Sequence, residues 1–122
     1  MPQLMLEFSS NIIEKMMLPE LLKQCHKILA ESLPTSIESC KSRAMEREIY
    51  CIGDGQAKNA FIHVTLKVLP GRSVEIRTMT ANKIMDILKH YFSESIKAFS
   101  TQITLEVIEL QPTYFKFASQ GS

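Results

Sequence analysis

The sequence predicts an α+β fold in which two helices cover one face of a four-stranded sheet. Apolar residues alternate along 60–69, two other stretches show one-face helical spacing, and the order strand, helix, strand occurs twice. With 122 residues the chain fits one domain, 1–122, with halves at about 1–53 and 54–115. Two topologies share this order, a ferredoxin-like split β-α-β arrangement and a tandem pair of parallel β-α-β units. Periodicity leaves both open.

The first half is predicted to begin with a short, mostly apolar strand over 3–8, which Pro2 opens. Proline lacks the donor that a sheet needs, and the first position of a strand tolerates it. A helix is expected to begin at Pro19 and to stop at Leu33-Pro34, because a residue before proline avoids helical angles. Its apolar face comprises Leu21, Leu22, Cys25, Ile28 and Leu29. A second strand is expected from about Arg43 to Ile52.

The second half begins with a polar turn at 53–56, followed by the clearest strand of the chain at 60–69. Its β-branched residues suit a pleated surface with one face packed. Ser73 is expected to cap a long helix. The apolar face of that helix comprises Ile84, Ile87, Leu88, Tyr91, Phe92 and Ile96. A last strand is predicted over about 102–110, before Pro112.

Charge and cysteine content exclude several classes of protein. The 14 basic and 13 acidic side chains give a net charge of +1, which argues against a protein built to coat nucleic acid or an anionic membrane. The three cysteines are an odd number without metal-type clustering, as expected of reduced thiols in the cytoplasm. The three histidines lack the spacing of a metal site or a catalytic triad. We therefore expect a cytoplasmic protein without a metal centre.

Three positions could combine into a site. Pro2 becomes a terminal secondary amine if Met1 is removed, and an apolar or cationic surrounding lowers the pKa of such an amine toward neutrality. A free amine near pH 7 is a competent general base. Arg72 lies before a predicted helix N-terminus, where its planar fork suits a carboxylate. Lys41 precedes the second strand. Taken singly, a Met-Pro start or a surface cation is usually without catalytic meaning; together they suggest a dicarboxylate held by cations beneath a base.

Four stretches of the chain, in one register without large gaps, resemble a known family. These are PQLMLEFSSNI at 2–12, Leu18-Pro19, DGQAKNAFIHVTLKVLPGRS at 54–73 and IELQPT at 108–113. They resemble the 5-carboxymethyl-2-hydroxymuconate isomerases of the tautomerase superfamily. The resemblance implies the tandem β-α-β topology with a four-stranded mixed sheet. It also implies a homotrimer with pockets near the subunit boundaries.

The same resemblance implies the chemistry. Pro2 would take the proton from the 2-hydroxy group of a muconate-type dienol and return one to a carbon further along, which yields the conjugated 2-oxo acid. Arg72 matches the family arginine that contacts a substrate carboxylate or carbonyl oxygen. No metal or organic cofactor is implied, since the conjugated system carries the electrons. The partner is a small unsaturated oxo or hydroxy dicarboxylate from the breakdown of aromatic compounds.

One position departs from the family pattern. Where the family has Arg-Ser-Arg, this chain has Lys41-Ser42-Arg43, so the positive charge is kept and the bidentate fork is lost. Arg43 is retained, either as a partial substitute or as a structural residue. The alternative function is a non-catalytic trimeric module that binds a ligand or regulates on the same fold. A ferredoxin-like effector domain is the third interpretation, which a monomeric or dimeric mass in solution would favour.

Overall fold

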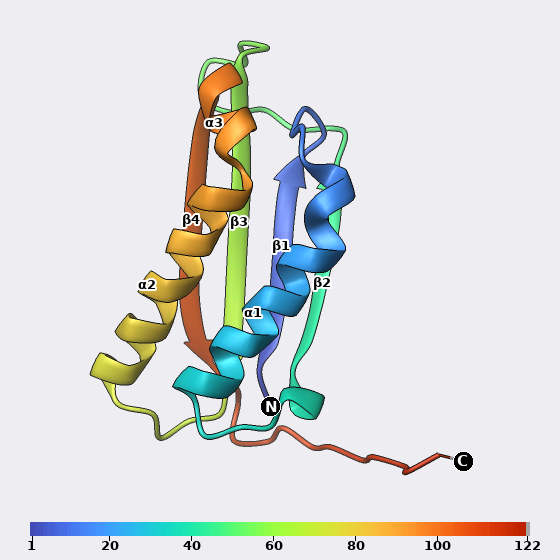
Figure 1. The fold of residues 1–122 in the computed structure, drawn as a ribbon, viewed down its shortest axis with the longest axis vertical. Helices are drawn as coiled ribbons and strands as arrows, with labels where there is room; N and C mark the ends of the chain where they lie inside the picture. The colour runs from blue at the N-terminus through green and yellow to red at the C-terminus, as the bar shows by residue number, and fades with distance from the viewer. Residues whose placement is uncertain (122) are drawn as a thin grey trace.

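The computed structural model describes residues 1–121, and its helices lie together on one side of a four-stranded sheet (Figure 1). In chain order the elements are β1 (Gln3–Ser9), η1 (Lys15–Met17), α1 (Leu18–Ser32), η2 (Ile37–Ser39), β2 (Lys41–Arg47), β3 (Asn59–Val68), α2 (Val74–Tyr91), α3 (Ser93–Ala98) and β4 (Ser100–Glu109). The strand order is β2-β1-β3-β4. Strands β1 and β2 are parallel, β3 and β4 are parallel, and β1 runs antiparallel to β3.

This order selects the tandem topology. The two strands of each half lie side by side, whereas a split β-α-β unit would hold another strand between them. The ferredoxin-like alternative is therefore wrong, and the α+β class with two main helices over one sheet face is confirmed.

The core lies between the sheet and the helices because side chains alternate across a strand. The two central strands bury Leu4, Leu6, Phe8, Ala60, Ile62, Val64, Leu66 and Val68 against the helices. The helices contribute Leu21, Cys25, Leu29, Ile84 and Leu88. The opposite sheet face is polar and half-exposed along both central strands. We call this surface the open face.

The sequence signals for the ends of the two main helices lie within a residue of the observed ends. Pro19 is the second residue of α1, and Leu33 is extended (φ −115°, ψ 149°) directly before Pro34. The hydroxyl of Ser73 accepts the N–H of Ile76 at 3.1 Å and caps α2. Within residues 1–121, no helix is long and apolar enough to cross a membrane.

The second strand differs from its prediction. It runs over Lys41–Arg47 rather than from Arg43 to Ile52, so Lys41 is its first residue and 48–52 lie outside it. The reason is its position at the edge of the sheet, where it pairs with β1, because β1 ends at Ser9, opposite Arg47. Beyond that point residues 1–121 offer β2 no further strand to pair with. The last strand is also shifted, to Ser100–Glu109.

The predicted long helix is broken at Phe92, between α2 and α3. The backbone N–H of Ser95 donates to the Glu14 carboxylate at 3.0 Å, and the Ser95 hydroxyl donates to the same group at 2.6 Å. The N–H of Ser95 is thereby diverted from the carbonyl four residues earlier, which interrupts the helical ladder. Phe92 stays in the core, whereas Ile96, expected on the same apolar face, lies beyond the break and is 41% exposed.

Candidate active site

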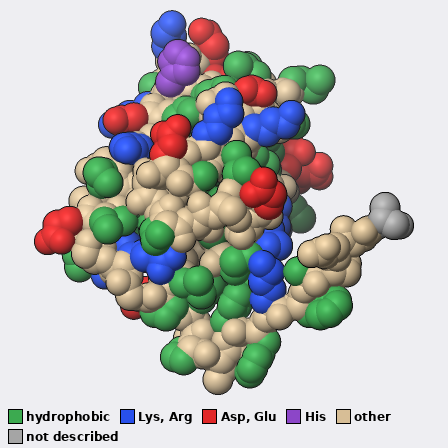
Figure 2. Space-filling model, turned by 60° about the horizontal axis from the view of Figure 1, so that its bottom comes forward, with side chains coloured by type: hydrophobic (Ala, Val, Ile, Leu, Met, Phe, Trp, Pro, Cys, Tyr) green, Lys and Arg blue, Asp and Glu red, His purple; other side chains and the backbone are tan. Residues whose placement is uncertain are grey.

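Four segments of the chain meet at one end of the sheet. Strands β1 and β2 begin there, and β3 and β4 end there, because β3 runs antiparallel to β1. This end therefore collects the N-terminus, the start of β2, the β3–α2 loop and the segment after β4. Figure 2 brings it forward and shows Lys and Arg side chains, with the C-terminal tail extending away from the body.

Pro2 and Lys41 are in direct contact at this end. The backbone N–H of Lys41 donates to the carbonyl of Pro2 at 3.2 Å, as the parallel register of Gln3 with Lys41 requires. Pro2 is buried, while the Lys41 side chain is exposed and its Nζ donates to the carbonyl of Ser39 at 3.3 Å. The residue next to the chain start is thus held by the sheet beside a cation.

Arg72 reaches the same end from the loop between β3 and α2. Gly71 makes that loop possible, because its φ of +102° is a conformation that side chains rarely adopt. Its N–H donates to the carboxylate of Glu109 at 3.1 Å, which ties the loop to the end of β4. Arg72 is half-buried, and its Nε atom is shielded from water without a hydrogen-bond partner among the described residues. A buried unpaired donor costs about 1–3 kcal/mol, which a bound anion can offset.

The electrostatics of this end act on the terminal amine. The pKa of the Met1 amine is lowered from its ordinary value of 8.0, first by burial and then by the positive charges of Arg72, Lys116 and Lys41. Cys40 acts in the opposite direction. The Pro2 nitrogen lies one residue further in, about 3–4 Å away by backbone geometry. If Met1 is removed, that nitrogen becomes an amine next to the same cations, which favour its uncharged, basic form.

The structure thus brings Pro2, Lys41 and Arg72 together, whereas the Arg43 side chain is engaged by Gln3. The Arg43 guanidinium donates from Nη1 to the side-chain oxygen of Gln3 at 2.8 Å, on the open face. It is absent from the charges that shift the amine pKa. Lys116 joins this group, and sequence reasoning missed it. The expected parallel pairing of β3 with β4 could have indicated its position, because parallel strands end at the same edge of a sheet and the residues that follow them therefore lie close together.

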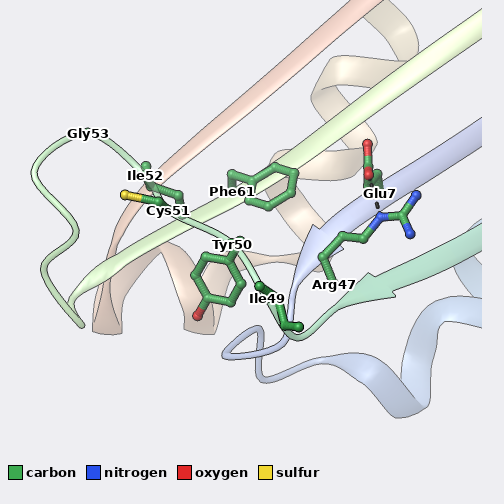
Figure 3. A pocket seen from close by; sticks show the side chains of 8 residues that line it. All are labelled: Glu7, Arg47, Ile49, Tyr50, Cys51, Ile52, Gly53 and Phe61. Carbon is green, nitrogen blue, oxygen red and sulfur yellow. Dashed lines mark hydrogen bonds and ion pairs between the residues drawn. The ribbon is translucent and has the colours of Figure 1, made fainter.

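Apart from this candidate site, a cavity of about 610 Å³ lies at the other end of β1 (Figure 3). Arg47 and Glu7 form an ion pair on one side, and the rings of Tyr50 and Phe61 meet edge to face at 6.3 Å on the other. Glu7, which lines the cavity, is five positions after Pro2 along β1, a separation of about 16 Å at roughly 3.3 Å per residue. Its arginine is already neutralised, so it offers an anion less than Arg72 does.

Histidine takes no part in the candidate site. The His63 ring lies on the open face, 2.6 Å from the Thr104 hydroxyl and 3.7 Å from the Glu106 carboxylate. The His26 ring contacts the Ser42 hydroxyl at 2.7 Å. No three His, Cys, Asp or Glu side chains within residues 1–121 are arranged to hold a metal ion.

Comparison with known proteins gives a consistent result. A family model described as 5-carboxymethyl-2-hydroxymuconate isomerase matches residues 2–119. The chain is 30% identical to a 5-carboxymethyl-2-hydroxymuconate Delta-isomerase from Escherichia coli over 113 residues, which cover 93% of this chain and 90% of that protein.

Solved structures agree with this match. A 5-carboxymethyl-2-hydroxymuconate isomerase from Deinococcus radiodurans R1 has a TM-score of 0.85 at 25% identity, with 94% of this chain and 88% of that one covered. A fused 4-OT protein that forms a symmetric trimer has a TM-score of 0.70 at 16% identity, with 90% and 88% covered. The second likeness shows the fold alone.

Proposed function

This chain belongs to the 5-carboxymethyl-2-hydroxymuconate isomerase family, and from that premise we propose that Pro2, once Met1 is removed, is its general base. The chain is an isomerase of the tautomerase superfamily. The proposed substrate is a 2-hydroxymuconate-type dienol dicarboxylate, and the product is its conjugated 2-oxo isomer. The position of the terminal amine, partly buried and close to the charges of Arg72, Lys116 and Lys41, is the observation that carries this proposal.

The proton balance of the reaction closes with Pro2 alone. The free amine removes the proton of the 2-hydroxy group, and the electron pair of that O–H bond moves into the conjugated system. The resulting ammonium returns the proton to a carbon further along, where a C–H bond forms. The amine is regenerated, so the step is an isomerisation. Burial and the nearby cations support the role, since both favour an uncharged amine at neutral pH.

The two cations flank Pro2 on opposite sides. Lys41 begins β2 and Arg72 follows β3, and these strands are the two neighbours of β1. We assign Arg72 to the carboxylate beside the 2-hydroxy group and to the oxygen on which negative charge collects as the proton leaves. Its unpaired Nε supports this assignment. Lys41 supplies a second positive charge on the other side, without the planar fork of an arginine.

The proposal includes a homotrimer in the cytoplasm. The open face is half-exposed along β1 and β3 in the described part of the chain, and a fused 4-OT protein of the same fold forms a symmetric trimer. Cys25, Cys40 and Cys51 are all free thiols, which suits a reducing compartment. Light scattering of the purified protein measures the assembly, and a monomeric mass would count against the trimer.

The test of the base begins with protein confirmed by mass spectrometry to start at Pro2. Ketonisation of a panel of 2-hydroxymuconate dienols is followed by ultraviolet absorbance. We expect turnover of dicarboxylate dienols, and a loss of about 10²–10⁴-fold in Pro2→Ala, the range typical of general bases. Unchanged turnover in Pro2→Ala, or retention of Met1 in cells, would refute the mechanism. A trimer that binds dicarboxylates but turns over no dienol would instead support the non-catalytic module.

A further inference from the structure

The C-terminal tail, residues 111–121, returns to the end of the sheet that holds Pro2. The N–H of Leu110 donates to the carbonyl of Val68 at 2.7 Å, so β4 leaves the sheet beside the β3–α2 loop. The N–H of Tyr114 then donates to the carbonyl of Gln111 at 3.1 Å, which turns the chain. Figure 1 shows the tail passing below the N-terminus on its way out. Its course therefore places tail side chains next to the candidate site.

Two side-chain contacts join the tail to the start of the chain. The Gln3 side-chain amide donates to the Tyr114 hydroxyl at 3.4 Å, and the Lys116 Nζ lies 3.6 Å from the sulfur of Met1. The other end of the Gln3 amide accepts from Arg43. The Gln3 contact does not depend on Met1, so it still holds the tail against the start of β1 in protein that begins at Pro2.

A cavity of about 400 Å³ lies between the tail and the start of β2. Lys41 lines it from the sheet and Lys116 from the tail, with Glu38 as the acidic side chain. Phe115 and Phe117 border it and are 88% and 89% exposed. A volume of this size is in the range of small-molecule sites, and two ammonium groups across it suit a carboxylate.

We propose that Lys116 is a substrate-binding residue, which pairs with Lys41 to hold the carboxylate of the dienol that lies farther from the 2-hydroxy group. This inference rests on the proposed function, since it divides the two carboxylates of the same substrate between two sides of Pro2. Arg72 takes the near carboxylate on the β3 side, and the lysine pair takes the far one on the β2 side.

The Lys116 charge should act on the base as well. After burial and Arg72, it is the next cause that lowers the pKa of the Met1 amine, and we expect the same charge to act on the Pro2 amine once Met1 is removed. Removal of the Lys116 charge raises the pKa of the amine, so a larger share of the amine is protonated at a given pH. The acid limb of the pH–rate profile then moves to higher pH. A tail residue that only supported the fold would leave this limb in place.

The experiment compares Lys116→Gln and Lys116→Arg with Lys97→Gln, in protein that starts at Pro2. Lys97 is a matched control because its side chain is 75% exposed on α3 and pairs only with Glu94 among the described residues. KM and kcat are measured for a dienol dicarboxylate and for its analogue without the far carboxylate. We expect Lys116→Gln to raise KM for the dicarboxylate about tenfold, the loss of one charge-assisted contact, and to leave the analogue unchanged.

Lys116→Arg should restore KM and the acid limb, and Lys97→Gln should match the parent. Equal changes for both substrates, or a Lys116→Gln variant with parental KM, would overturn the proposal. The dissociation constant of cis,cis-muconate, a dicarboxylate that cannot ketonise, separates the two failures. If the parent binds muconate and turns over no dienol, the proposed function fails, and weaker binding by Lys116→Gln still supports the subsite. If binding is equal in the parent and in Lys116→Gln, the subsite fails.

Discussion

Replacement of Arg72 by alanine tests the electrostatic basis of the candidate site. The side chain is half-buried, its Nε has no partner among residues 1–121, and among the charged groups its charge is the largest influence on the terminal amine pKa. The variant therefore loses two effects at once. It no longer binds the near carboxylate, and it no longer holds the amine pKa down.

The size of the first effect follows from the contact. A hydrogen bond to a charged group contributes about 1.5–3 kcal/mol, and each 1.4 kcal/mol is about a tenfold change. Because part of the Arg72 side chain faces water, screening favours the lower half of that range. We expect kcat/KM for the dicarboxylate dienol to fall about 10- to 50-fold. An analogue without the near carboxylate should lose less, because it keeps only the contact of Arg72 with the oxygen that becomes negative.

The second effect has a definite sign. Loss of the Arg72 charge raises the pKa of the amine, so activity, which needs the unprotonated form, appears at higher pH than in the parent. Arg72→Lys keeps the charge and should keep the parental acid limb while binding the carboxylate less well. Arg47→Ala, in the cavity at the opposite end of β1, is the control and should change neither property.

The assay is ultraviolet monitoring of ketonisation between about pH 5 and 9, with thermal denaturation to confirm that each variant folds. Equal losses of kcat/KM for the dicarboxylate and its analogue would contradict the assignment of Arg72 to a carboxylate. An acid limb that stays in place in Arg72→Ala would contradict its electrostatic action on the amine.

Two further predictions concern the fold. Glu14→Ala should destabilise the protein by about 1.5–3 kcal/mol in urea unfolding, because it leaves the N–H and hydroxyl of Ser95 without their carboxylate. The control Glu94→Ala, at an exposed position beside Ser95 on α3, should cost under about 0.5 kcal/mol. Equal unfolding midpoints for the two variants would refute this prediction. Burial raises the pKa of the Cys25 thiol to about 12. At pH 8, Ellman's reagent should therefore modify the exposed Cys51 quickly and Cys25 only after unfolding. Peptide mapping that finds Cys25 modified in the folded protein would contradict this prediction.

The local pattern of apolar residues predicted most of the secondary structure. It failed where the bounds of an element depend on a contact with a distant segment of the chain. Strand β3 was predictable because its alternating side chains serve one packed face. Strand β2 was not, since its length depends on where β1 ends. The break at Phe92 was equally hidden, because the carboxylate of Glu14, 81 positions before Ser95, captures the N–H that a continuous helix needs.

The candidate site shows the same division. Pro2 and Arg72 were predicted by residue type and position, as an amine at a chain start and a cation before a helix. Lys116 carried no such signal of its own, because a single lysine in a tail outside the helices and strands looks like any surface charge. Only the arrangement of the strands, with β3 and β4 ending where β1 begins, places it beside the amine.

By itself, then, the sequence determined which segments are strands and helices, which of their faces are apolar, and which residue types could act. These properties depend on neighbours two to four positions apart. The tertiary structure alone decided the strand order, the end of β2, the break between α2 and α3, and the set of charges around the terminal amine. Those features depend on contacts between residues 38 or more positions apart, and Coulomb interactions follow distance in space rather than along the chain.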